Sequence, residues 1–113
     1  MNEKYLKYQE IADCPIRNVL DVIAGKWAML IISVLNEGKP LCFGELNRAI
    51  PDISPKMLSK SLKILVEEGL VSRKVIPDIP PRTQYRLTDY GCTLLTAIQP
   101  MIEWAMAHMR RKA

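Results

Sequence analysis

The sequence has few of the residues that catalytic and metal-binding sites require. Its 113 residues include one histidine, His108, and three cysteines with no C-x-x-C pair. A zinc site needs about four nitrogen or sulfur ligands at short spacings, and a disulfide scaffold needs a denser, even set of cysteines. There is also no G-x-S-x-G, H-E-x-x-H or glycine-rich phosphate loop. We therefore expect a protein that is not an enzyme and has no metal and no cofactor.

Long hydrophobic runs are missing as well. No apolar stretch approaches the ~20 residues of a membrane-spanning helix, and the first residues contain no apolar segment followed by a cleavage site. The chain is 49% hydrophobic and 25% charged, which is too apolar for disorder and too mixed for a fibre. We expect a single domain over residues 1–113, located in the cytoplasm and without a membrane partner.

The spacing of apolar residues, together with the glycines and prolines that end regular structure, predicts the order of the helices and strands. Helical periodicity ended by glycine or proline predicts helices over residues 15–24, 27–35, 43–50 and 55–68. Two strands are predicted over residues 70–75 and 83–87, joined by a proline-rich loop that can be neither helix nor central strand. A last helix should follow Thr88, and Pro100 should kink or interrupt it.

The helix predicted over residues 55–68 carries the most informative charge pattern. Ser54 is suited to cap this helix and Pro55 to begin it. Its core side should consist of Leu58, Leu62, Leu65 and Val66. Lys56, Lys60 and Lys63 fall on the opposite side at helical spacing, so their ammonium groups form one ridge. Such a ridge can neutralise the phosphates of duplex DNA, and the positive end of the helix dipole adds to the attraction.

Basic residues also mark the predicted hairpin. Between Lys39 and Arg86 there are nine basic and five acidic residues, so this half of the chain holds the entire net charge of +4. We therefore expect double-stranded DNA as the partner, with the hairpin on the DNA backbone or in the minor groove. The candidate DNA-binding residues are Ser54, Pro55, Lys56, Ser59, Lys60, Lys63, Arg73, Lys74, Arg82 and Arg86. The alternatives are a solvated lysine face and strand charges that only discourage sheet pairing.

The order of elements defines a winged helix. We expect an α+β, mostly α fold, in which a helix-turn-helix over residues 43–68 is followed by a two-stranded wing over residues 70–87. A polar arm over residues 1–13 precedes it, and a helix over residues 89–112 follows. Because a fold alone does not fix function, the alternative function is a winged-helix module that binds proteins rather than a DNA sequence.

Several short motifs follow one another in a specific order. They are Cys14-Pro15, Leu20 to Trp27, Phe43 to Leu46, Ile53 to Ser59, Leu65 to Arg73, Pro80-Pro81 and Tyr85 to Thr88. In this order they resemble the HxlR-type winged helix-turn-helix transcriptional regulators of bacteria, which are related to the MarR group. The resemblance covers most of the chain, from about Cys14 to Trp104. It implies a homodimer, with N- and C-terminal dimerisation helices, that binds inverted-repeat operator DNA.

The last predicted helix has apolar surface to spare for such a dimer. A chain of this size needs only one side of that helix for its own core, and leftover apolar surface favours a partner. The candidate interface residues are Leu95, Ile98, Ile102, Trp104, Ala105 and Met109. The alternative is that both sides of the helix pack internally.

Among the cysteines, Cys14 has a local argument for reactivity. It lies at the start of the first predicted helix, where unpaired N–H groups and the helix dipole favour the thiolate, although Asp13 opposes this effect. The resemblance implies that some relatives sense oxidants with a cysteine in this place, so an oxidant or a small molecule is one hypothesis for the signal. The alternative is that Cys14 is a small buried residue of the dimer interface. Cys42 is expected in the core.

Overall fold

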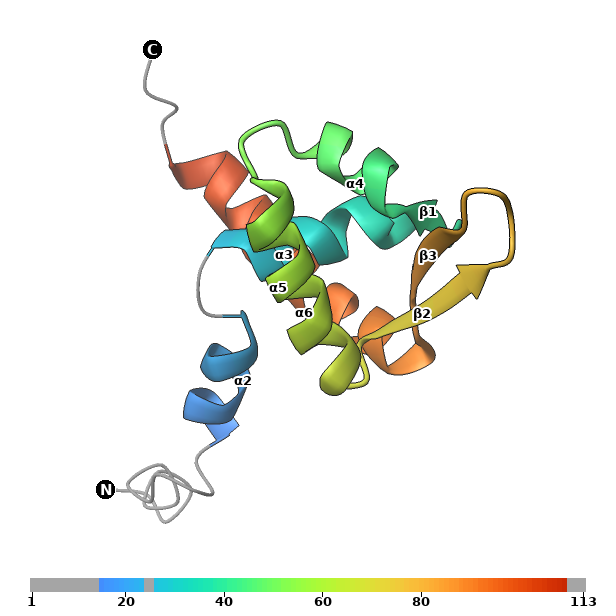
Figure 1. Cartoon of the computed structure of the whole chain (residues 1–113). Helices are drawn as coiled ribbons and strands as arrows, with labels where there is room; N and C mark the ends of the chain where they lie inside the picture. Colours follow the sequence, from blue (N-terminus) through green and yellow to red (C-terminus); the bar gives the residue numbers. More distant parts are fainter. Residues whose placement is uncertain (1–14, 24–25, 110–113) are drawn as a thin grey trace.

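Helices form most of the structure, and a small sheet projects from one side of them (Figure 1). The computed structural model describes residues 15–23 and 26–109. The helices are α2 (Pro15–Ile23), α3 (Lys26–Val34), α4 (Phe43–Ala49), α5 (Pro55–Glu67) and α6 (Asp89–His108), and the strands are β1 (Leu41–Cys42), β2 (Val71–Ile76) and β3 (Arg82–Leu87). The expected mostly helical α+β class is confirmed, and so are the helices and the hairpin. The arm predicted over residues 1–13 lies outside the described residues.

The hydrophobic core is centred on α3. Ile31 and Ile32 of this helix are fully buried, and α3 packs against α5, α6, α4 and α2. The side of α5 predicted to face the core does so, because Leu58, Leu62 and Leu65 are all buried. Burial of this side fixes which residues α5 presents to solvent.

The sheet has three strands, in the order β1-β3-β2, where two had been predicted. The extra strand pairs Leu41 with Tyr85 and Cys42 with Gln84. Two residues are too few to show the alternation by which a strand is recognised in a sequence, so the prediction missed it. The predicted hairpin is confirmed, with an antiparallel register that runs from Val71 opposite Leu87 to Ile76 opposite Arg82.

The last helix runs without interruption from Asp89 to His108, although Pro100 lies inside it. Of the two expected effects of Pro100, the interruption is therefore absent, whereas the kink stays a prediction. A proline removes one backbone hydrogen bond, here the one to the carbonyl of Thr96. Both residues are exposed, so water can satisfy that carbonyl at small cost. The part of the predicted helix beyond residue 109 lies outside the described residues.

A tight junction joins the wing, the end of α5 and the start of α6. The Thr88 hydroxyl caps α6 by accepting a hydrogen bond from the Gly91 N–H at 2.9 Å, as predicted, and it donates one to the Gly69 carbonyl at 2.6 Å. The Thr88 N–H also donates to the Leu70 carbonyl at 3.1 Å. Gly91 is buried against Leu70, where a Cβ atom would lie 3.0 Å from the Leu70 carbonyl carbon. No sequence pattern distinguishes this glycine, because the close approach of Leu70 comes from a segment about twenty residues away.

None of the helices within residues 15–23 and 26–109 is long and apolar enough to cross a membrane.

Candidate nucleic-acid interface

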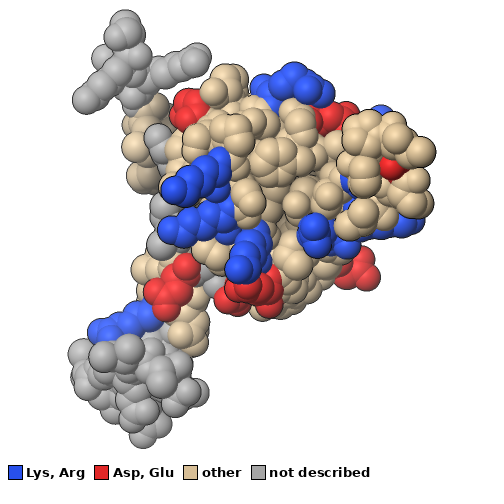
Figure 2. Space-filling model, viewed as in Figure 1, with Lys and Arg blue, Asp and Glu red and all other residues tan. Residues whose placement is uncertain are grey.

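The exposed side of α5 is cationic. Lys56, Lys60 and Lys63 are all exposed, as predicted from their spacing. Within the part of the chain that the structure describes, none of the three forms an ion pair, although Glu67 lies one turn beyond Lys63. Lys and Arg side chains gather over α5 on the face seen in Figure 2. These ammonium groups are therefore available to an external anion.

The start of α5 adds to this positive surface. Ser54 is the predicted N-cap: its hydroxyl accepts a hydrogen bond from the Met57 N–H at 3.1 Å. Pro55 occupies the first turn, where its missing N–H costs nothing. Ser59 is exposed one turn further on. The N-terminus of α5 thus combines a positive dipole end with short hydroxyl donors.

Hollows border the cationic ridge on both flanks. On the wing side, a groove of about 440 Å³ lies between α5 and the hairpin, with Lys63 on one wall and Arg73 on the other. Buried Tyr85 lines the same groove. On the other flank, Lys60 borders a smaller hollow with Asp21 of α2. Glu67 lines the groove on the wing side too, so that groove brings together the cations of Lys63 and Arg73 and one carboxylate.

Two of the predicted contact residues lie on the other face of the hairpin. Arg73 pairs with Tyr85 across the strands, and both point towards α5. Lys74 and Arg86 sit one position along their strands, so they project from the opposite face, where they line a separate hollow. The structure does not bring these two residues together with the α5 ridge, so we expect them to contribute less than Arg73 to a contact centred on α5.

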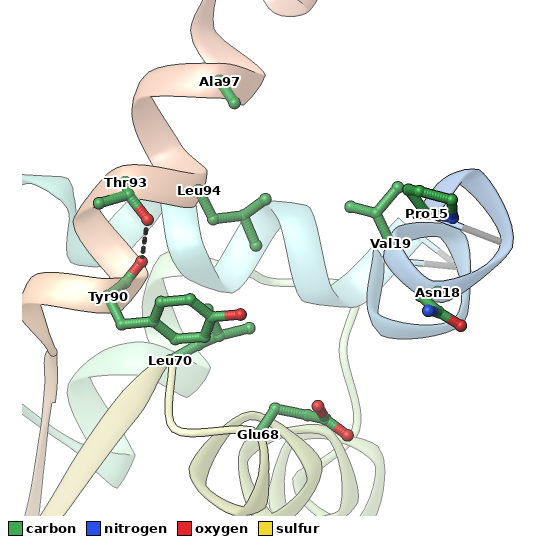
Figure 3. Close-up of a pocket in the computed structure, with 9 residues that line it drawn as sticks. All are labelled: Pro15, Asn18, Val19, Glu68, Leu70, Tyr90, Thr93, Leu94 and Ala97. Carbon is green, nitrogen blue, oxygen red and sulfur yellow. Dashed lines mark hydrogen bonds between the residues drawn. The ribbon is translucent and has the colours of Figure 1, made fainter. Parts of the chain in front are cut away.

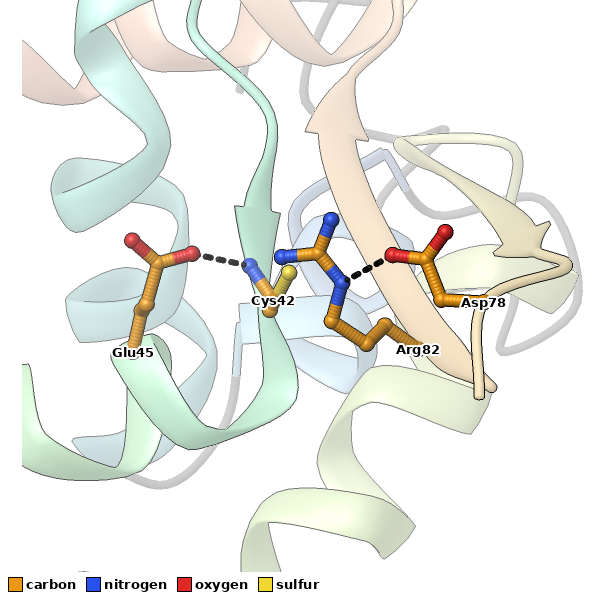
Figure 4. Close-up of polar contacts among 4 residues, drawn as sticks. All are labelled: Cys42, Glu45, Asp78 and Arg82. Atoms are coloured by element: carbon orange, nitrogen blue, oxygen red, sulfur yellow. Dashed lines mark hydrogen bonds and ion pairs between the residues drawn. The ribbon is translucent and has the colours of Figure 1, made fainter. Parts of the chain in front are cut away.

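Arg82 begins β3 at the wing tip and is partly neutralised. Its Nε donates to Asp78 Oδ2 at 2.9 Å in an exposed ion pair (Figure 4). Its guanidinium points towards Cys42, which is half-buried and precedes α4 as its N-cap. The expectation that Cys42 belongs to the core is therefore wrong, because this cysteine is only half-buried and is not among the residues of the core cluster.

Glu45 completes the cap of α4. Its Oε1 accepts a hydrogen bond from the Cys42 N–H at 2.9 Å. This bond holds the pKa of Glu45 below its ordinary value of 4.5, with smaller contributions from the Cys42 side chain, Arg48 and Arg82. The cap therefore favours the ionised carboxylate.

Replacing Glu45 by glutamine should lower the melting temperature at pH 7 but not in acid. Because the folded pKa lies below the unfolded one, the carboxylate stabilises the fold above the ordinary pKa. That contribution disappears as the pH falls through the folded pKa. Thermal melts at pH 7 and about pH 3 measure the difference, with Glu103→Gln on the exposed surface of α6 as the control. A deficit of equal size at both pH values would contradict the role of the charge.

A cavity of about 470 Å³ lies away from the α5 ridge, between α2, α6 and the end of α5. Figure 3 shows Val19 of α2 and Leu94 of α6 facing each other across it, with the Tyr90 ring alongside Leu70. No sequence pattern could indicate this cavity, because its walls come from three separate segments.

The predicted dimer residues divide between core and surface. Leu95 and Ile98 are buried within the protomer, so they cannot offer surface to a second copy, and their prediction as interface residues is wrong. Both face inward because the first half of α6 covers the core. Ile102 and Ala105 are half-buried, whereas Trp104 and Met109 are exposed. Cys14, the predicted sensor, lies outside the described residues.

The fold and this surface together define a class of protein. In sequence, α4 and α5 form a helix-turn-helix, the hairpin follows as a wing, and the second helix exposes a row of lysines. This is the architecture of a winged helix-turn-helix protein. The chain belongs to the HxlR-like helix-turn-helix family, whose model matches residues 22–113.

Individual relatives agree with this family. The chain is 44% identical over 100 residues to an uncharacterized HTH-type transcriptional regulator of Halalkalibacterium halodurans, covering 88% of each chain. It resembles the crystal structure of a putative MarR-family transcriptional regulator from Porphyromonas gingivalis W83, with a TM-score of 0.80, 41% identity and coverage of 86% of this chain and 94% of the other. It also resembles the oxidised form of the redox regulator HypR, with a TM-score of 0.78, 35% identity and coverage of 88% of this chain and 100% of the other. The protein is a transcriptional regulator of the helix-turn-helix type.

Proposed function

We propose that this regulator binds double-stranded operator DNA as a homodimer, with α5 in the major groove and the wing on the flanking backbone or minor groove. The observation that carries the proposal is the row of Lys56, Lys60 and Lys63 on the second helix of the helix-turn-helix, where all three are exposed and form no ion pair with any residue that the structure describes. The groove lined by Lys63 and Arg73 supports it, because these two cations outweigh the one carboxylate in the lining, that of Glu67, and so favour a phosphate backbone. The proposal places the protein in the cytoplasm with the genome and assigns it no catalytic step.

A mobility shift on the DNA upstream of the regulator's own coding sequence tests this function. With about ten cationic contacts per dimer, the logarithm of the binding constant should fall with the logarithm of salt concentration at a slope of about −6 to −9. Two α5 helices of a dimer should read half-sites about 34–36 Å apart. Binding that does not respond to salt would favour the alternative, a winged helix that binds proteins.

Exposed apolar side chains on two helices support the dimer. Trp104 is 58% exposed on α6 and stacks on His108 with ring centroids 5.1 Å apart. Ile16 and Leu20 of α2 are each 51% exposed. Apolar surface of this extent favours burial against a second copy.

Replacing Trp104 by glutamate should therefore raise the dimer dissociation constant at least about tenfold, because a charge would enter the apolar interface. Sedimentation equilibrium measures this change. Gln99→Glu adds the same charge to an exposed position of α6 and should leave the dimer intact. If both variants dimerise as the parent protein does, Trp104 is not in the interface.

A second proposal concerns the signal. We propose that Cys14 responds to thiol oxidation and changes DNA affinity, a hypothesis favoured by the similarity to HypR, which is described as a redox regulator. DNA affinity before and after treatment with diamide should change in the parent protein but not in Cys14→Ser. Cys92→Ser, which removes the exposed cysteine of α6, is the matched control and should respond like the parent protein. An unaltered response in Cys14→Ser would exclude Cys14 as the sensor.

A further inference from the structure

The end of the wing is apolar, although its stem is basic. Ile79, in the loop between β2 and β3, is 102% exposed, which makes it the most exposed large hydrophobic residue among those the structure describes. Three exposed prolines surround it, at positions 77, 80 and 81. A single exposed isoleucine is common on protein surfaces. This one is distinguished by its place, at the far end of a hairpin whose inner face carries Arg73 and borders the α5 groove.

The tip is also held in one shape. The Asp78 N–H donates to the Ile76 carbonyl at 2.8 Å, and the Asp78 carboxylate accepts from Arg82 Nε at 2.9 Å (Figure 4). The prolines restrict their own backbone angles and those of the preceding residues. Because Ile79 is held between these constraints, inserting its side chain into a partner would cost little additional conformational entropy.

The charge at the tip points to a contact other than a phosphate. Asp78 partly neutralises Arg82 at the tip, whereas Lys63 and Arg73 behind the tip form no ion pair with any residue that the structure describes, so phosphate is attracted more to the stem than to the tip. Proteins that bind the minor groove often insert apolar side chains between base steps and bend the duplex. Flexible pyrimidine–purine steps open at the lowest cost.

We propose that Ile79 is an apolar wedge that enters the minor groove beside each half-site and opens a pyrimidine–purine step. It would thereby make the wing tip a determinant of sequence preference. This inference rests on the proposed function, because it assumes that α5 and the wing bind one duplex. DNA is favoured over a protein as its occupant because Ile79 lies in the loop of the same hairpin whose first strand carries Arg73, which lines the groove beside α5.

The test compares Ile79→Ala with Val75→Ala, which shortens another exposed β-branched residue of the same hairpin, 52% exposed on β2. Duplexes of the upstream DNA carry 2-aminopurine at the flanking step, and binding is followed by anisotropy, 2-aminopurine fluorescence and the bend angle from energy transfer. Ile79→Ala should bind about tenfold more weakly, since most of an apolar side chain leaves a buried site. It should also lose the fluorescence increase and part of the bend, with an unchanged salt slope because no charge is removed.

The controls separate this inference from the function on which it rests. Val75→Ala should bind and bend DNA as the parent protein does, and Ile79→Leu should retain most of the affinity because it keeps an apolar side chain of similar volume. Equal affinity, bending and fluorescence in Ile79→Ala and the parent protein would overturn the wedge while leaving DNA binding intact. Failure of the parent protein itself to bind the duplex would overturn the proposed function instead. Because Ile79 makes no buried contact, an unchanged melting temperature should show that its variants are folded.

Discussion

Replacing Lys56, Lys60 and Lys63 together by alanine should weaken duplex DNA binding by about a hundredfold or more at moderate salt. A dimer would lose six ammonium groups that are exposed and form no ion pair within the described part of the chain. At about 0.9 units per phosphate, the slope of the salt dependence should become shallower by about five units. Folding should be unaffected, because α5 keeps its buried leucines and its Ser54 cap. Anisotropy titrations over a series of salt concentrations measure both quantities.

A matched variant distinguishes local contacts from the overall charge. Lys39, Lys74 and Arg86 are also exposed, but Lys74 and Arg86 lie on the face of the hairpin that points away from α5. Replacing these three by alanine removes the same charge from each chain. The control variant should keep most of its affinity and of its salt slope. If both triple variants lost the same amount of DNA affinity, the net positive charge of the protein, and not the α5 ridge, would attract the DNA.

Replacing Gly91 by alanine should reduce the free energy of unfolding by about 2–4 kcal/mol. The added Cβ would overlap the Leu70 carbonyl oxygen and lie 3.1 Å from Leu87 Cδ2. Most of this contact is with backbone that is itself bonded to Thr88, so it cannot be relieved by turning a side chain. Urea denaturation followed by circular dichroism, at one protein concentration, gives the free energy of unfolding.

The same substitution at Gly44 is the control for that experiment. A Cβ there would meet only the Arg48 Nη1 atom, at 3.4 Å, which is the far end of a flexible side chain. Since alanine favours helix over glycine by up to about 1 kcal/mol, Gly44→Ala should be neutral or stabilising. If Gly91→Ala were as stable as the parent protein, α6 would not be seated on Leu70 as described.

Features that depend on neighbouring residues could be predicted from the sequence. Ser54 and Thr88 cap the helices that follow them because a hydroxyl reaches backbone N–H groups only a few residues ahead. The lysine ridge followed for the same reason, since helical spacing and a buried leucine side determine which side is exposed. The order of helices and hairpin could be predicted from these local signals.

Features that depend on distant partners could not be predicted in this way. Leu95 and Ile98 belong to an apolar helix face, and only the position of the core decides that they are covered by the protomer itself. β1 exists because β3 lies beside it, and the cavity near Tyr90 exists because three segments meet there. Because side chains alternate along a strand, the sequence predicts that Arg73 and Lys74 point to opposite faces of the hairpin. It does not predict which of them faces α5, which follows from the pairing of Arg73 with buried Tyr85.

The junction at Thr88 has a mechanical consequence. One hydroxyl and one amide of this residue connect the last turn after α5, the root of the wing and the first turn of α6. These three segments cannot change their relative orientation without breaking these hydrogen bonds, so they move as one rigid unit. In the proposed dimer, a change in the crossing angle of the two α6 helices would therefore rotate α5 and the wing of both protomers by a similar amount. A signal that changes this angle would lower DNA affinity without contacting the lysines of α5.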